Sequence, residues 1–273
     1  MIQFDYNRFH RTKTGGIYLS YLDIESLTEM LLQDYKPELL TEPGAIEYDD
    51  FLEGYLGVSL DYQHIYTSGD EGDILGCAIF SNQRLAVFDK ENKRKSYRDY
   101  GPNTVVLDLS LVEGNRVIQE NITGLHEGGH IWIHGPLLQE DPHQMTLAGF
   151  KYNKICCSRS KIEEVQKPYS SIEESWREWQ ATTFAVTMAL PRKSLKIAVP
   201  ELFKRYGVNG QQMVIDTDPG SWELSYHTIP EELKNIYNMS KEAIRYRLTK
   251  TGFYITKKKF EEEHAQMSLF DFL

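Results

Sequence analysis

Two histidines and a glutamate near the middle of the chain have the types and the spacing that hold a catalytic zinc ion. They stand in the run His126-Glu127-Gly128-Gly129-His130, which fits the pattern H-E-x-x-H. Residues four apart share a helix face, so both imidazoles can reach one ion. Glu127 is rotated by about 100° from His126 and can instead take a proton from a water molecule beside the ion. The motif therefore predicts a zinc site with Glu127 as its general base.

The same five residues could instead lie on a surface helix with two solvated histidines. The flanking sequence argues against this alternative, because apolar residues on both sides of the motif follow helical spacing over residues 115–133. Gly128 and Gly129 each cost a helix about 1 kcal/mol relative to alanine. Two glycines at these positions indicate that another element packs closely against this helix.

A catalytic zinc site needs a third protein ligand. His134 shares the helix face, but three ligands in a row cannot converge on one ion, so we expect it beside the coordination sphere or simply at the helix end. Glu178 is a better source, because it heads a stripe of small and apolar residues that could pack on the two glycines. The stripe consists of Ala181, Ala185 and Met188. We therefore predict Glu178 as the third ligand, with Glu173 and Glu174 as rivals.

These motifs resemble those of the ImmA/IrrE family of metallo-endopeptidases, most strongly over residues 115–191. The resemblance rests on His126-Glu-x-Gly-His130, on Glu178-x-x-Ala181-x-x-Phe184-Ala185 and on Leu190-Pro191. Carried over by position, it implies zinc ligands at His126, His130 and Glu178, with Glu127 catalytic. It also implies a protein substrate, in particular a helix-turn-helix transcriptional repressor. Cleavage would relieve repression of a mobile element or in a stress or DNA-damage response.

The chain also departs from the family pattern. Thr182 stands where the family usually has Asn or Asp, Gly128 stands where a larger apolar residue is usual, and the gap between His130 and Glu178 is long. Thr182 follows Glu178 by four residues, where its hydroxyl can orient a histidine ligand more weakly than a carboxylate would. We expect this departure to change the tuning of the ligands rather than the site itself.

The composition of the 273-residue chain is that of a soluble globular protein, with 41% hydrophobic and 26% charged residues. A formal net charge of −10 argues against general binding to nucleic acid or to anionic membranes. The N-terminus lacks an apolar signal segment, and no run reaches the ~18 apolar residues of a transmembrane helix. Three cysteines make no disulfide framework, so we expect reduced thiols in a cytoplasmic protein. A thiolate zinc site at Cys156-Cys157 is the alternative.

Periodicity predicts an α+β fold in which a small sheet packs on a zinc-binding helix pair, followed by a helical C-terminal region. The expected elements are a helix at 22–35, strands at 58–62 and 104–110, a hairpin of 74–80 with 84–88, and a charged turn at 90–98. We expect a metallopeptidase domain over 1–200, a helical subdomain over 201–260 and a tail over 261–273. The sheet edge could hold an extended peptide by strand addition.

Residues 135–171 form a long connection that could line the cleft. His143, Tyr152 or Tyr169 could stabilise the oxyanion there, and the sequence does not choose among them.

Two short helices are expected near the C-terminus. A capping box at Thr228 opens the first, Ser240 caps the second, and Gly252 ends it. The pair resembles a helix-turn-helix, with Arg245 and Arg247 on the second helix. Because the chain is acidic, we favour a packing or substrate-docking hairpin and do not expect direct DNA binding.

The tail contains Gln266-Met267-Ser268-Leu269-Phe270, which closely resembles the peptide by which bacterial proteins bind the DNA sliding clamp. In such a peptide Leu269 and Phe270 would fill an apolar pocket while Gln266 makes polar contacts. The alternative is a terminal segment folded back on the protein. A second function therefore stays open, namely a non-proteolytic, zinc-containing interaction protein that docks to the sliding clamp or to a repressor.

Overall fold

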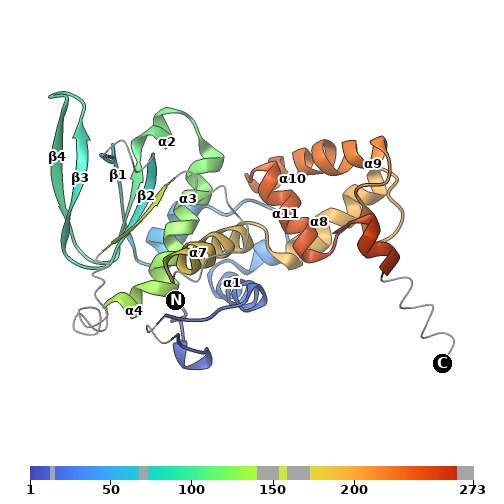
Figure 1. Cartoon of the computed structure of the whole chain (residues 1–273), viewed down its shortest axis with the longest axis horizontal. Coiled ribbons are helices and arrows are strands. Elements are labelled where there is room, and N and C mark those ends of the chain that lie inside the picture. Colours follow the sequence, from blue (N-terminus) through green and yellow to red (C-terminus); the bar gives the residue numbers. More distant parts are fainter. Residues whose placement is uncertain (13–15, 68–72, 140–153, 159–172, 263–273) are drawn as a thin grey trace. The chain divides into compact units, whose positions relative to one another are not determined.

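The computed structural model in Figure 1 describes residues 1–12, 16–67, 73–139, 154–158 and 173–262. Its architecture is α+β, as predicted. The chain divides into two compact units: the first contains Met1–Pro37 and Ile46–Ala189, and the second contains Glu38–Ala45 and Leu190–Leu273. The domain boundary expected between 200 and 201 falls inside helix α8 (Arg192–Arg205), so the second unit begins earlier than the sequence indicated.

The first unit contains a four-stranded mixed sheet with the order β1-β5-β2-β6. Strand β1 (Ser59–Gln63) runs parallel to β5 (Thr104–Asp108). Strand β2 (Ile74–Ile79) runs antiparallel to both β5 and β6 (Lys154–Ser158). All five residues of β5 are buried, as expected for an apolar strand in the interior of a sheet that is covered on both faces.

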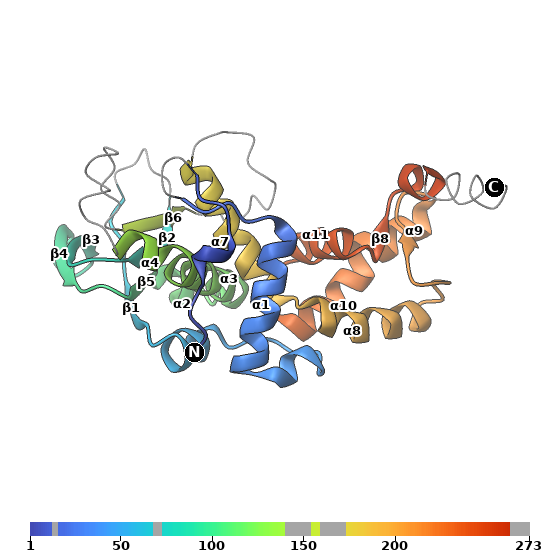
Figure 2. The same ribbon diagram turned by 90° about the horizontal axis from the view of Figure 1, so that it is seen from below.

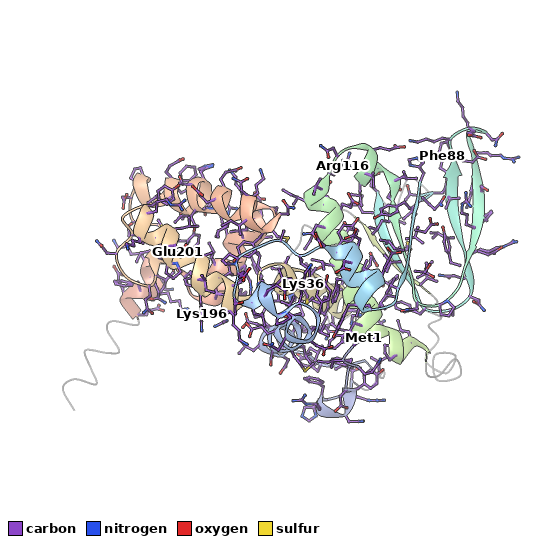
Figure 3. The ribbon with its side chains drawn as sticks, turned by 180° about the vertical axis from the view of Figure 1, so that it is seen from behind. Met1, Lys36, Phe88, Arg116, Lys196 and Glu201 are labelled. Atoms are coloured by element: carbon purple, nitrogen blue, oxygen red, sulfur yellow. A yellow bond between two sulfur atoms is a disulfide. The ribbon has the colours of Figure 1, made fainter. Side chains whose placement is uncertain are left out.

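Three long helices extend this core. Helix α3 (Val117–Gly129) packs on β2 and β5, and α7 (Glu173–Ala189) packs against both α3 and α1 (Tyr21–Tyr35). Figures 1 and 2 show α7 beside both helices. Figure 3 shows Arg116 where α3 begins. Two short helices flank α3 in the chain: α2 (Leu109–Glu113) precedes it and α4 (Gly135–Gln139) follows it. The sheet and α7 thus hold α3 between them.

The predicted hairpin between 74–80 and 84–88 is wrong. Strand β3 (Gln83–Asp89) pairs antiparallel with β4 (Arg94–Tyr100), over residues where we expected a charged turn. No residue of β4 is buried, so its sequence shows no apolar face that would mark it as a strand. Phe88 lies on this two-stranded ribbon (Figure 3).

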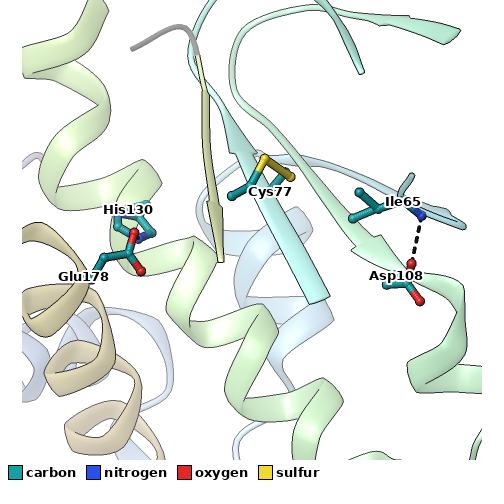
Figure 4. Close-up of a disulfide and its surroundings, with 6 residues drawn as sticks. Ile65, Cys77, Asp108, His130 and Glu178 are labelled. Carbon is teal, nitrogen blue, oxygen red and sulfur yellow. Dashed lines mark hydrogen bonds and ion pairs between the residues drawn. A yellow bond between two sulfur atoms is a disulfide. The ribbon is translucent and has the colours of Figure 1, made fainter. Parts of the chain in front are cut away.

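Cys77 and Cys156 form a disulfide, whereas we expected reduced thiols (Figure 4). They are register partners on β2 and β6, with their Cα atoms 4.1 Å apart. The two cysteines are separated by 79 positions in the sequence, and the sequence gives no sign of their proximity because pairing between distant strands leaves no local pattern. The bond also removes the alternative of a thiolate zinc site at Cys156-Cys157.

The second unit is helical with one small parallel ribbon. Its helices are α8 (Arg192–Arg205), α9 (Pro219–Glu223), α10 (Ile229–Tyr237) and α11 (Lys241–Thr251), and its strands are β7 (Met213–Val214) and β8 (Tyr254–Ile255). Ser240 accepts a hydrogen bond from the Ala243 amide at 3.2 Å, and Gly252 ends α11 with a φ of 85°, both as predicted. The expected capping box at Thr228 is wrong, because a π-helical turn runs directly into α10 and Thr228 makes no side-chain cap.

Both arginines of α11 are engaged within the second unit. Arg247 is fully buried, and its Nε donates to the Leu190 carbonyl at 2.8 Å. The Arg245 guanidinium lies 4.3 Å from the centroid of the Tyr226 ring. These contacts agree with a packing role for the helix pair.

The described residues also include short irregular helices. There are 3₁₀ turns at Tyr6–Arg8 and Pro37–Leu40, and π-helical segments at Asp50–Tyr55, His130–His134 and Leu224–Thr228. Across the part of the chain that the structure describes, no helix has the length and apolar character needed to cross a membrane.

Candidate metal centre

His126 lies near the end of α3, and His130 begins the π-helical turn that continues it. Both side chains are completely buried, and their Nε2 atoms are 3.1 Å apart. The four-residue spacing therefore brings the two rings together as the motif predicted. Helices that widen to a π-turn often do so at functional sites.

Glu178 reaches the same point from α7. Its Oε2 is 3.6 Å from His126 Nε2, and its Oε1 is 3.7 Å from His130 Nε2. Figure 4 shows Glu178 facing His130 across the gap between α7 and α3. Of the two rivals, Glu174 is exposed to solvent and Glu173 begins the helix. Helix α7 thus presents the buried carboxylate of Glu178, which is 7% exposed, to the two imidazoles.

The geometry of these three side chains fits a metal ion. One ligand atom from each lies within 4.8 Å of the others. Two ligands bound to a tetrahedral zinc ion at about 2.05 Å would be about 3.3 Å apart. The separations of 3.1, 3.6 and 3.7 Å bracket that value. Buried charged groups are normally paired or bound to metal, so this buried group can hold a metal ion.

The two glycines of the motif are packed by different elements. A Cβ on Gly129 would lie 3.0–3.2 Å from atoms of Phe184 on α7, which is the close approach that the sequence indicated. A Cβ on Gly128 would instead lie 2.8 Å from Leu52, so this glycine faces the π-helical segment Asp50–Tyr55 rather than α7. The expectation that both glycines pack on α7 is therefore correct only for Gly129.

Glu127 is completely buried and lies against strand β2. A Cβ on Gly76 would be 2.7 Å from Glu127 Oε1 and 2.9 Å from its Cγ. The absent side chain at Gly76 makes room for the carboxylate. The sequence reasoning missed this residue, since a glycine within a strand marks a close approach without naming the partner.

The imidazoles of His126 and His130 each have a polar neighbour at Nδ1, the nitrogen that does not face Glu178. Thr182 Oγ1 lies 3.2 Å from His126 Nδ1, the contact that the spacing from Glu178 suggested. His134 Nδ1 lies 3.0 Å from His130 Nδ1, and its Nε2 lies 2.9 Å from Gln180 Oε1. His134 is thus beside the ligands rather than among them.

Burial lowers the pKa of His134 to about 3, from an ordinary value of 6.5. The hydrogen bond to Gln180 Oε1 opposes this lowering of the pKa, and the positive charge of Arg177 adds to it. His134 is therefore a neutral imidazole near neutral pH, with one donor and one acceptor nitrogen. The sequence did not indicate a role for Gln180, because no known motif places an amide side chain two residues after a metal ligand.

Other predicted site residues lie outside the described structure. These are the three oxyanion candidates His143, Tyr152 and Tyr169, and the clamp-like residues Gln266, Met267, Ser268, Leu269 and Phe270. Their roles stay predictions.

Comparison with models of known protein families finds no match to the chain, and comparison with curated proteins finds none either.

Proposed function

We propose that the protein is a zinc-dependent endopeptidase. The observation that carries the proposal is the buried group of His126, His130 and Glu178, with Glu127 next to the first ligand on the same helix. Two imidazoles and one carboxylate leave one coordination position free on a tetrahedral ion, which is the arrangement of catalytic rather than structural zinc sites.

In the proposed mechanism, three side chains bind the metal ion and a fourth transfers the proton. His126 and His130 would hold the ion through their Nε2 atoms, and Glu178 would hold it through its carboxylate. When bound, zinc supplies positive charge that acidifies the attacking water and polarises the scissile carbonyl. Glu127 accepts the proton of the water and then delivers it to the leaving amine. Because Glu127 is buried between α3 and β2, its carboxylate is kept in one place during both transfers.

The substrate in this proposal is a protein. The resemblance to ImmA/IrrE endopeptidases supports a helix-turn-helix transcriptional repressor, whose cleavage would relieve repression. Strand β6 stands last in the strand order of the described sheet and pairs antiparallel with β2, and the proposal places recognition of an extended segment by strand addition at this edge.

Metal content tests the ligand set. We expect about one zinc ion per wild-type chain and a loss of zinc in His126→Ala and Glu178→Ala. Glu174→Ala is the matched control, because Glu174 lies one turn earlier on α7 and is exposed; it should keep its zinc. A folded wild-type protein without zinc would overturn the proposal.

Hydrolysis is tested by incubating a candidate repressor with wild type and with Glu127→Gln. The variant should keep its zinc and lose cleavage, because an amide cannot take the proton from water. Cleavage that survives in Glu127→Gln would exclude Glu127 as the base. Zinc bound without any cleavage of helix-turn-helix repressors would favour the non-proteolytic alternative.

A further inference from the structure

We propose that His134 and Gln180 are positioning residues that hold His130 in the tautomer whose Nε2 carries no proton. They act through a hydrogen-bond chain that ends on the backbone carbonyl of Ile17. The inference rests on the proposed metal site, because the lone pair on Nε2 is what His130 would offer to an ion.

The chain has three links, all within the first unit. His130 Nδ1 is 3.0 Å from His134 Nδ1, and His134 Nε2 is 2.9 Å from Gln180 Oε1. Gln180 Nε2 then donates to the Ile17 carbonyl at 2.8 Å. The four residues are at most 6% exposed, so bulk water does not compete for these groups.

The direction of every bond follows from the Ile17 carbonyl, since a carbonyl can only accept. Gln180 must therefore point its NH₂ group at Ile17 and its oxygen at His134. That oxygen needs a donor, so the proton of His134 lies on Nε2 and its Nδ1 is the acceptor. His130 must then donate from Nδ1. One proton on Nδ1 leaves the Nε2 of neutral His130 unprotonated, so that its lone pair can accept a hydrogen bond or bind a metal ion. Nε2 is the atom that faces His126 and Glu178.

His126 lacks such a constraint. Its Nδ1 is 3.2 Å from the Thr182 hydroxyl, which can donate or accept by rotating. Without metal, His126 can therefore carry its proton on Nε2 and donate to His130 Nε2, 3.1 Å away. With metal on Nε2, the same ring would carry its proton on Nδ1. The structure thus assigns a fixed tautomer to His130 and a changeable one to His126.

Multiple-bond ¹H–¹⁵N NMR of the imidazoles tests this assignment directly in the full-length wild-type protein. In metal-free protein at mildly alkaline pH, we expect the Nδ1–H tautomer for His130 and the Nε2–H tautomer for His134. Addition of zinc should leave both unchanged and move the proton of His126. A metal-free His130 that carries its proton on Nε2 would overturn the proposal.

Zinc affinity gives a second test, through a pair of variants at one position. His134→Leu removes the acceptor for His130 Nδ1 and should weaken zinc binding about 10- to 100-fold, the usual effect of losing a partner of a metal ligand. His134→Asn places an amide oxygen near the position of Nδ1 and should restore affinity to within a few-fold. Equal zinc affinity in His134→Leu and wild type would contradict the positioning role. If His134→Leu fails to fold, the wild-type NMR result alone decides.

Failure of this inference is distinguishable from failure of the proposed function. A wild-type protein that binds no zinc refutes the metal site, while the tautomers of the metal-free protein remain measurable. A protein that binds zinc with His130 in the other tautomer refutes only the hydrogen-bond chain.

Discussion

Gly76 lies against Glu127, and this contact determines how much room the carboxylate has. The nearest atoms to a Cβ at Gly76 would be Glu127 Oε1 and Cγ, together with Thr123 Cγ2 at 2.9 Å. A methyl group cannot fit there unless Glu127 moves, because contacts below 3.0 Å lie inside van der Waals separation. Oε1 is the far end of a flexible side chain, so the added methyl group should displace the carboxylate before it displaces the backbone of β2.

We therefore predict that Gly76→Ala lowers peptide hydrolysis by about 100-fold, the effect of displacing a catalytic group by about 1 Å. Zinc content should stay at the wild-type level, since the three atoms nearest to a Cβ at Gly76 belong to Glu127 and Thr123 rather than to a histidine. Gly101→Ala is the control, because its Cβ would meet only Asn82 Oδ1, at 3.7 Å. Paired measurements of the hydrolysis rate and of bound zinc check the prediction. Wild-type activity in Gly76→Ala would show that Glu127 has more room than the structure indicates.

His134 makes the stability of the metal-free protein depend on pH. Its pKa falls from 6.5 to about 3 on folding, because burial disfavours the charged ring. Below pH 6.5 the unfolded chain binds a proton that the folded chain does not bind. The contribution of His134 is therefore fully present above pH 6.5 and is lost as the pH falls towards 3.

At about pH 5 this loss amounts to about 2 kcal/mol of unfolding free energy. Urea unfolding of metal-free protein at about pH 5 and pH 7.5 should show it in wild type. His134→Asn should show a decrease that is smaller by that amount. His227→Asn, at an exposed histidine, is the control and should retain the wild-type decrease. An identical pH dependence in wild type and His134→Asn would mean that His134 is protonated in the folded state.

At the scale of elements, helices were easier to predict than strand partners. Helices α1, α3 and α11 were predicted, and α1 is capped by Ser20, whose side chain accepts from the Asp23 amide. Each carries its apolar spacing within one stretch of sequence, and α1 and α11 also carry a capping serine there. The pairing of β2 with β6 joins segments far apart in the chain, and β4 has no apolar face. No local sequence pattern therefore indicates that β2 pairs with β6, and none marks β4 as a strand.

The same contrast holds for the site. The proposed metal ligands were predictable because His126 and His130 follow helical spacing and Glu178 heads an apolar stripe. Gly76, Gln180 and Ile17 come from other segments or fit no motif. They reach the site only through tertiary packing.

The disulfide between β2 and β6 gives a prediction at this scale. Peptide mapping of non-reduced protein should recover Cys77 linked to Cys156. Reduction should lower the unfolding free energy by about 2–4 kcal/mol, since the bond closes a long loop in the unfolded chain. Cys157→Ser is the matched control and should keep the link. Alkylation of all three cysteines without a reductant would contradict the disulfide.

At the scale of the whole molecule, the proposed metal site belongs entirely to the first unit. All three ligands lie between residues 46 and 189, and the second unit has its own buried core around α8, α10 and α11. Ligand binding stabilises the state to which the ligand binds, by about 4 kcal/mol when the free concentration is about 1,000 times the Kd.

We therefore predict that zinc slows amide hydrogen exchange in α3 and α7 while leaving α10 and α11 unchanged. Exchange measured by mass spectrometry with and without zinc checks this prediction, and Glu178→Ala should remove the protection. Protection that extends equally to α10 and α11 would show that the two units open together.

Residues 38–45 belong to the second unit, although the chain before and after them belongs to the first. This arrangement limits how the protein can be shortened. A gene fragment that stops after residue 189 would encode every proposed ligand. It would also encode Leu40, which is 3% exposed and belongs to the second unit, and that side chain would then face solvent. A fragment that starts at residue 190 would lack the same segment. Neither unit can be separated from the other by a single cut in the chain.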